Sequence, residues 1–150
     1  MERFIVKNQR QTEKLANLLA KEILKYRKRC LPRGNRGALV FGLIGELGAG
    51  KTTFIKAFAK GLGIKNKITS PTFVLMKNYK NFFHIDCYRI KNAKDILELD
   101  FKEIVSDPQN IIMIEWAERV KKILPKDTIW IKFKIMSPEK RNVIISNYSN

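Results

Sequence analysis

The chain has 150 residues, of which 45% are hydrophobic and 29% charged, with only eight Gly and five Pro. This composition excludes a disordered or fibrous protein and predicts one globular domain over residues 1–150, long enough to bury roughly two-thirds of its unfolded surface. The balance of 30 Lys and Arg against 14 acidic residues gives a net charge of +16, which attracts polyanions at long range. Nucleic acid is therefore a candidate partner, although a general enrichment in Lys explains the same charge.

The sequence contains no segment typical of a secreted or membrane protein. The first residues lack an apolar stretch followed by small residues, and the longest apolar run, Ala38 to Ile44, is too short to span a bilayer. Cys30 and Cys87 lack metal-ligand spacing and are expected to be free thiols in a reducing compartment. The sequence therefore predicts a cytoplasmic protein without a membrane partner.

The first predicted elements are a strand over Phe4–Val6 and a helix from Thr12 to about Arg29. Apolar side chains recur in the helix with a 3.6-residue period, and Thr12 is the expected N-cap. Basic residues are densest in residues 25–36, KYRKRCLPRGNR, which makes this segment the best local candidate for an RNA contact. It fits the solvated end of a helix and a surface loop equally well.

The apolar run Ala38 to Ile44 predicts a strand covered on both faces, and a Gly-rich loop follows it directly. The loop sequence GELGAGKT matches the pattern G-x-x-x-x-G-K-[ST], in which backbone amides and the next helix surround phosphate oxygens. In this pattern Lys51 reaches the β- and γ-phosphates as a catalytic group, and the Thr52 hydroxyl ligates Mg²⁺. The expected nucleotide-binding residues are Gly45, Gly48, Ala49, Gly50, Lys51 and Thr52.

A second amphipathic helix is expected from Thr52, with Gly61 and Gly63 as possible stops. Residues 72–79 and 81–90 then predict two strands joined by a tight turn, which are expected to pair antiparallel. The remaining predictions are short helices at 95–99, 101–105 and Ala117–Ile123, and strands at Ile111–Ile114, Ile129–Met136 and about 141–146. The predicted fold class is an α/β P-loop NTPase domain whose mixed, mostly parallel central sheet is flanked by helices.

Phosphoryl transfer requires a carboxylate opposite the phosphate loop, and two acids stand at the ends of predicted strands. Glu115 closes the apolar run before it and Asp86 ends another strand, so one is expected near Mg²⁺ and the other could orient the attacking water. Either could instead be a solvated acid or an ion-paired one. His84 lies two residues before Asp86, on the same strand face, and fits a structural histidine as well as a catalytic one.

Ser70 and Thr72 flank Pro71 in the segment after the P-loop helix. In GTPase-like proteins hydroxyls in such a loop sense the γ-phosphate, although the same three residues also fit an ordinary turn.

Four motifs occur together in one order, and with them the chain closely resembles the TsaE (YjeE) family of bacterial ATPases for tRNA threonylcarbamoyladenosine formation. The motifs are GELGAGKTTF at Gly45–Phe54, SPTF at Ser70–Phe73, HIDCYR at His84–Arg89 and IEW at Ile114–Trp116. The resemblance implies ATP and Mg²⁺ as cofactors, and action with TsaB and TsaD, whose complex is cycled through ATP binding and hydrolysis.

The resemblance also implies roles for individual positions. Asp86 and Glu115 would be the acids needed for turnover, and Thr53 would lie against the phosphates. Ser70 and Thr72 would form a loop responsive to nucleotide state. Trp116 would be a packing or partner contact beside the site. A polar residue between Gln9 and Thr12 would contact the base or ribose.

No arginine finger stands out, although Arg89 and Arg119 are candidates, so low intrinsic activity and charge stabilisation by a partner are expected. Two other functions remain open. One is a P-loop small-molecule kinase, which needs an acceptor pocket and usually an Arg-rich lid. The other is a basic RNA-binding module that holds nucleotide as a structural ligand.

Overall fold

The computed structural model describes residues 1–30, 37–71 and 75–147, with the backbone alone at residues 29 and 30. In chain order the elements are β1 (Glu2–Val6), α1 (Gln9–Cys30), β2 (Leu39–Ile44), α2 (Lys51–Gly61), β3 (Met76–Tyr79), β4 (Phe82–Asp86), α3 (Lys94–Leu97), α4 (Phe101–Ser106), β5 (Ile111–Glu115), the 3-10 helix η1 (Ala117–Ile123), β6 (Ile129–Ile135) and β7 (Arg141–Ser146). None of the described helices is long and apolar enough to cross a bilayer.

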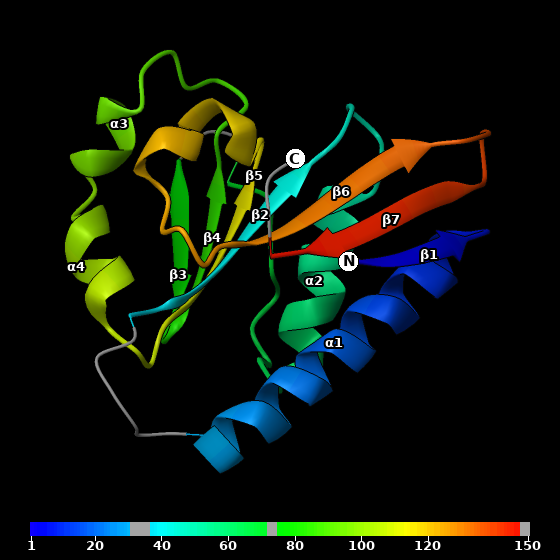
Figure 1. Cartoon of the computed structure of the whole chain (residues 1–150), viewed down its shortest axis with the longest axis horizontal. Helices are drawn as coiled ribbons and strands as arrows, with labels where there is room; N and C mark the ends of the chain where they lie inside the picture. The colour runs from blue at the N-terminus through cyan, green and yellow to red at the C-terminus, as the bar shows by residue number, and fades with distance from the viewer. Residues whose placement is uncertain (31–36, 72–74, 148–150) are drawn as a thin grey trace.

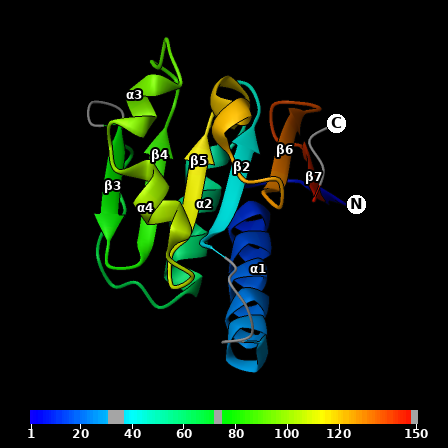
Figure 2. The same ribbon diagram turned by 60° about the vertical axis from the view of Figure 1, so that its left-hand side comes forward.

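The strands form a seven-stranded sheet in the order β1-β7-β6-β2-β5-β4-β3, with α1 and α2 on one side (Figure 1). The four inner strands β6, β2, β5 and β4 are parallel to one another, and antiparallel strands complete both edges. The predicted α/β class and mixed sheet are confirmed, with parallel pairing confined to the centre. Figure 2 shows the helices α3 and α4 on the side of the sheet opposite α1 and α2.

The sheet separates two apolar cores. Side chains on one face pack against α1 and α2, where the Phe41 and Phe58 rings contact each other edge to face with their centres 5.3 Å apart. Side chains on the other face pack against α3, α4 and η1. Along β2 the alternate residues belong to opposite cores, which explains why this strand reads as a continuous apolar run.

The first helix begins at Gln9, three residues earlier than predicted, and Thr12 is not its N-cap. The Gln11 amide donates to Asn8 Oδ1 at 2.9 Å, so Asn8 caps the helix. In return, Gln11 Oε1 accepts from the Lys7 amide at 2.8 Å. Thr12 instead lies buried in the first turn.

Helix α2 ends as predicted at a left-handed glycine. Gly63 has a φ of 85°. Its amide donates to the Lys60 carbonyl, and the Ile64 amide reaches back to the Ala59 carbonyl. This pair of bonds is a Schellman motif, which satisfies the last carbonyls of the helix.

Strand β4 is shorter than the apolar pattern predicts. That pattern runs to Ile90, but the strand ends at Asp86, as predicted for this acid, because Asp86 Oδ1 accepts from the Tyr88 amide at 2.9 Å and turns the chain. The next residue, Cys87, is a buried free cysteine, and burial raises the pKa of its thiol to about 12. The thiol of Cys30 lies outside the described side chains.

Candidate functional site

The Gly-rich loop joins the carboxyl end of β2 to the start of α2. Gly45, Gly48 and Gly50 have φ values of 153°, 75° and 101°, in the range that favours glycine. At Gly45 a Cβ atom would lie 2.7 Å from the Phe133 carbonyl oxygen. Gly50 precedes α2 without a side-chain cap, so the first amides of the helix are left for an external anion.

Lys51 is folded back onto the loop that precedes it. Its Nζ donates to the carbonyl oxygens of Gly45 at 2.6 Å and Glu46 at 2.9 Å, and it lies 4.2 Å from the centre of the Trp116 ring. Burial lowers the pKa of Lys51, and the nearby carboxylates, Glu115 foremost, oppose that shift. The Lys51 side chain therefore rests at the centre of the loop on two neutral carbonyl ligands that a phosphate could replace.

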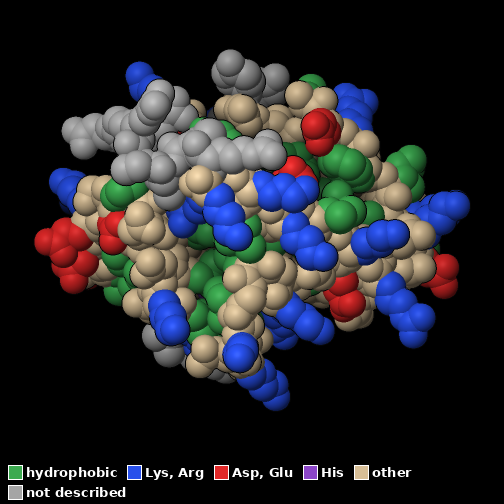
Figure 3. All heavy atoms as spheres, turned by 90° about the horizontal axis from the view of Figure 1, so that it is seen from below, with side chains coloured by type: hydrophobic (Ala, Val, Ile, Leu, Met, Phe, Trp, Pro, Cys, Tyr) green, Lys and Arg blue, Asp and Glu red, His purple; other side chains and the backbone are tan. Residues whose placement is uncertain are grey.

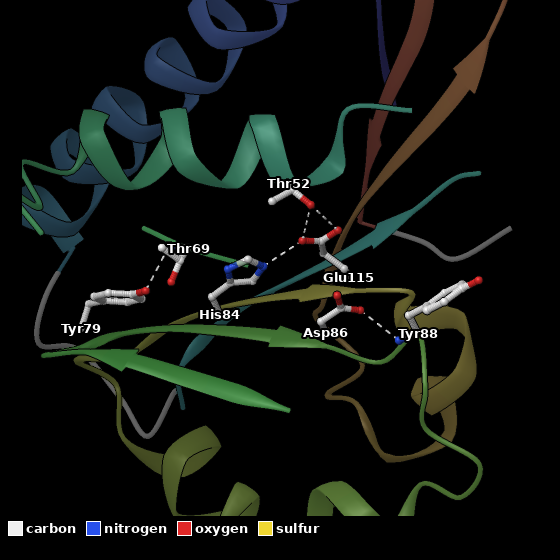
Figure 4. Close-up of polar contacts among 7 residues, drawn as sticks. All are labelled: Thr52, Thr69, Tyr79, His84, Asp86, Tyr88 and Glu115. Atoms are coloured by element: carbon white, nitrogen blue, oxygen red, sulfur yellow. Dashed lines mark hydrogen bonds and ion pairs between the residues drawn. The ribbon is translucent and has the colours of Figure 1, made fainter. Parts of the chain in front are cut away.

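Glu115 lies opposite the first turn of α2. The Thr52 hydroxyl lies 2.8 Å from Oε1 and 2.9 Å from Oε2 of Glu115, as Figure 4 shows. The backbone explains this meeting, since Glu115 is paired with Leu43 of β2 on one side and Asp86 of β4 on the other. Parallel pairing places the ends of the three strands at one edge of the sheet, beside the loop.

His84 is fully buried and touches the same carboxylate. Its Nε2 lies 2.8 Å from Glu115 Oε1, and its Nδ1 has no hydrogen-bond partner among the described residues. An ionised carboxylate only accepts hydrogen bonds, so the contact with Glu115 is a hydrogen bond when the imidazole carries a proton on Nε2. Histidine and hydroxyl thus hold Glu115 from two sides, an arrangement that sequence spacing alone did not indicate.

Asp86 lies on the same sheet face as His84, as the two-residue spacing predicts. Its carboxylate is half-buried and, in Figure 4, points toward Glu115. Burial raises the pKa of Asp86, while the hydrogen bond from the Tyr88 amide opposes the rise. The structure therefore places two carboxylates beside the loop. Glu115 is buried and bonded to Thr52 and His84, whereas Asp86 is partly exposed to solvent.

These residues fit a magnesium ion shared with phosphate. The Thr52 hydroxyl and the carboxylates of Glu115 and Asp86 supply hard oxygen donors, the ligand type that Mg²⁺ prefers. Within the described ranges, no group of three or more His, Cys, Asp or Glu side chains could hold a metal without other ligands. A site with so few protein ligands is typical of Mg²⁺, which keeps water and phosphate in its coordination shell.

A hollow of about 130 Å³, which we call the second hollow, adjoins the loop. It lies between the start of α1, the glycine loop and the residues at the β6–β7 connection. Its lining residues are Asn8, Gln9, Thr12, Gly48, Gly50, Thr53, Glu139 and Arg141. Gln9 and Thr53, which the sequence assigned to nucleotide contact, are brought together here, whereas the contribution of Glu139 and Arg141 was missed because no pattern places that hairpin over the loop.

The other predicted residues lie beside the loop or outside the described part of the chain. Trp116, in a left-handed conformation after β5, contacts Tyr88 with ring centres 5.1 Å apart and ring planes tilted by 49°. The Arg119 guanidinium lies 5.8 Å from both ring centres. Ser70 is half-buried, and Thr72 lies outside the described residues.

Comparison with known proteins identifies relatives along most of the chain. The family model of the threonylcarbamoyl adenosine biosynthesis protein TsaE matches residues 6–143. The tRNA threonylcarbamoyladenosine biosynthesis protein TsaE of Treponema pallidum is 37% identical over 107 residues, covering 69% of this chain and 78% of the relative. That of Rickettsia typhi is 43% identical over 104 residues, covering 66% and 71%.

A solved structure supports the same relationship. The crystal structure of YdiB from Bacillus subtilis superposes with a TM-score of 0.66 at 27% sequence identity. The match covers 95% of this chain and 82% of that one.

Proposed function

Because the chain belongs to the TsaE family of tRNA threonylcarbamoyladenosine biosynthesis proteins, we propose that it is a magnesium-dependent P-loop ATPase in that process. The observation that carries the proposal is the paired contact of the Thr52 hydroxyl with both oxygens of Glu115, directly after the Lys51 loop. A hydroxyl held on a carboxylate at the first turn of a P-loop helix is the arrangement that Mg²⁺-nucleotide hydrolysis requires.

Each group has a separate task in this proposal. The Lys51 ammonium leaves its two loop carbonyls and binds the β- and γ-phosphate oxygens, and the amides at the start of α2 bind the remaining phosphate oxygens. Thr52 and Glu115 hold Mg²⁺, which when bound neutralises charge on the phosphates. Asp86, the more exposed carboxylate, orients the attacking water, and Gln9 with Thr53 contacts the base or ribose at the second hollow.

The proposal extends to partners and location. We expect the protein to act in the cytoplasm with TsaB and TsaD, and its hydrolysis cycle to reset their complex through the segment that includes Ser70 and Thr72. Intrinsic turnover is slow, because an arginine that completes the site comes from a partner or from rearrangement of Arg119, which stacks near Tyr88 and Trp116.

The test measures ATP hydrolysis with and without TsaB and TsaD, in the wild type and in the variants Asp86→Ala and Glu115→Ala. We expect phosphate release without any added acceptor, an increase with the partners, and a fall in kcat of about 100-fold or more in either variant. Binding of a fluorescent ATP analogue should persist in Asp86→Ala, since the hydrogen bond of this carboxylate is to the Tyr88 amide, outside the phosphate loop.

The control is Lys51→Ala, which should lose nucleotide binding itself. Normal binding and hydrolysis in Lys51→Ala would contradict the proposal. Phosphate transfer only to a small-molecule acceptor would indicate a kinase, and bound nucleotide without turnover under all conditions would indicate a structural ligand.

A further inference from the structure

A hollow lies beside the second half of α2, away from the phosphate loop. It has a volume of about 560 Å³ and is formed by the last turns of α2 and the segment that follows. Its lining begins at Lys56, in the middle of α2, so with a rise of about 1.5 Å per residue it starts roughly 8 Å along the helix axis from the loop. The residues that line it are Lys56, Lys60, Gly63, Ile64, Lys65, Asn66 and Ile68.

Three lysines surround this hollow without a carboxylate among the lining residues. Lys56, Lys60 and Lys65 are exposed, and none of them forms an ion pair with a described acidic side chain. Lys60 lies in the last turn of α2, where it also offsets the negative end of the helix, but Lys56 and Lys65 have no such role. Three ammonium groups around one concave surface repel one another, and a polyanion would relieve that repulsion.

The backbone that lines the hollow after α2 is held by hydrogen bonds and by a buried side chain. Ile64 is tied to α2 through its amide bond to the Ala59 carbonyl, and Ile68 is buried. Beyond Ile68, the Thr69 amide donates to the Tyr79 hydroxyl on β3 at 3.3 Å. The lysine stems are therefore carried by an ordered backbone, which lowers the entropy lost when a ligand binds.

The face of the molecule on this side carries more basic than acidic side chains (Figure 3). Figure 3, the view from the side to which this end of α2 points in Figure 1, shows Lys and Arg side chains across the face with few acidic ones between them. In contrast, the basic run at residues 25–36, the best local candidate for an RNA contact in the sequence, has internal partners within its described part. Lys25 pairs with Glu22 at 2.7 Å, and Arg27 donates to the carbonyls of Gln109 and Asn110.

We propose that the hollow lined by Lys56, Lys60 and Lys65 binds the sugar–phosphate backbone of RNA, as a contact separate from the nucleotide site. RNA fits better than an acidic protein surface because phosphates repeat along a strand at a high density of charge, and isolated lysines bind them as point charges without fixed geometry. Tight, sequence-specific recognition is not expected, since nothing in the lining offers an aromatic platform for a base.

The test measures binding of a fluorescein-labelled, unmodified tRNA transcript to the full chain by anisotropy between 50 and 200 mM salt. The triple variant Lys56→Gln, Lys60→Gln, Lys65→Gln should bind roughly tenfold more weakly at 100 mM salt. The slope of log K against log salt should fall by about two to three, which corresponds to three lost phosphate contacts.

The matched control is the triple variant Lys102→Gln, Lys122→Gln, Lys126→Gln. It removes the same charge from α4, η1 and the turn after η1, on the other side of the sheet, at exposed positions. This control should keep most of the affinity and slope. Equal loss in the two variants would overturn the proposal, because net charge rather than the hollow would then drive binding.

Two further measurements separate this proposal from the others. Binding of a fluorescent ATP analogue should be unchanged in the Lys56/Lys60/Lys65 variant and its melting temperature should not fall, so failure of the ATPase proposal would leave this result intact. Unchanged tRNA binding with lost capture by a TsaB–TsaD complex would overturn the RNA assignment in favour of a protein partner.

Discussion

At the residue scale, Gly45 shows how the sequence pattern of the loop follows from contact distances. The glycine combines a φ of 153° with a gap to the Phe133 carbonyl that leaves no room for a Cβ atom. A positive φ alone costs an L side chain about 1–3 kcal/mol. The first glycine of the pattern is therefore required by the neighbouring strand β6 as well as by the phosphate.

Gly45→Ala should destabilise the protein by about 2 kcal/mol or more, because strain and collision add. For a chain of this size, this corresponds to a fall in melting temperature of about 4–8 °C, measured by thermal unfolding without nucleotide. Gly63→Ala is the control, since Gly63 has a φ of 85° but no atom within 4 Å of a built Cβ. A larger loss in Gly63→Ala would contradict the role of the close approach.

His84 is a positioning residue for Glu115 in the proposed mechanism. His84→Phe keeps most of the volume but removes the nitrogen that lies 2.8 Å from Glu115 Oε1. We expect kcat to fall about 10–100-fold with little change in KM, the size of effect seen when a group supporting a metal ligand is lost. His84→Gln, which can still donate, should recover part of kcat.

A packing role alone would give a different result. In that case both His84 variants would change the melting temperature in proportion to their loss of activity, and His84→Gln would show no rescue. The kinetic measurements and thermal unfolding of both variants distinguish the two roles.

At the element scale, the close contact of α1 with α2 depends on a glycine near the end of α2. A Cβ atom at Gly61 would lie 2.8 Å from Ala20 Cβ and 3.0 Å from Asn17 Oδ1. The small residues allow the two helices to approach and bury the shared core. The same contact sets the path of α1, whose first turn lines the hollow beside the phosphate loop.

Gly61→Ala should therefore lower the free energy of unfolding by about 1–3 kcal/mol, although alanine is the better helix former by about 1 kcal/mol. The measurement is urea unfolding of Gly61→Ala, Ala20→Gly and the double variant. We expect a coupling free energy of about 1 kcal/mol, because removing the Ala20 methyl makes room for the new one. Additive effects in the double variant would contradict direct contact at this position.

The elements differ in how well the sequence predicted them. Strands β2 and β5 were predicted closely because both are buried on two faces and carry continuous apolar runs. The predicted start of α1 was wrong because Thr12 and Asn8 are both acceptable caps. Only the fold shows that Thr12 is buried and that Asn8 is the cap. The apolar run to Ile90 made the predicted strand too long, because the Tyr88 amide donates to the Asp86 side chain and so turns the chain away from the sheet.

The site was predictable where its residues are adjacent in sequence or follow buried strands. The phosphate loop, Glu115 and Asp86 belong to this group. The Lys51 contact with Trp116 and the approach of Glu139 to the loop depend on folding of distant segments, for which a single sequence carries no period or spacing signal.

At the scale of the whole molecule, the net charge of +16 implies self-repulsion in the folded state. Surface ion pairs such as Lys25 with Glu22 contribute little against it, since exposed pairs are worth less than about 1 kcal/mol. Screening shortens the range of repulsion from about 30 Å at 0.01 M salt to about 10 Å at 0.1 M. Salt should therefore stabilise this fold.

We expect the melting temperature to rise by several degrees between 10 and 150 mM sodium chloride, measured by calorimetry at pH 7 without nucleotide. A variant with three Lys→Gln changes at residues 102, 122 and 126 should show a smaller rise, because less repulsion remains to be screened. A melting temperature that falls with salt would show that local attraction outweighs the net charge.

Without nucleotide, the Lys51 side chain bonds to the phosphate loop itself. Because the ammonium already rests on the carbonyls of Gly45 and Glu46, an arriving triphosphate exchanges one set of ligands for another. Only the difference in free energy between the two sets of Lys51 contacts favours association. Nucleotide therefore binds more weakly, and dissociates faster, than it would if Lys51 had no such contacts. When product departs, the lysine returns to its resting ligands, and the loop is ready for the next molecule without having to unfold.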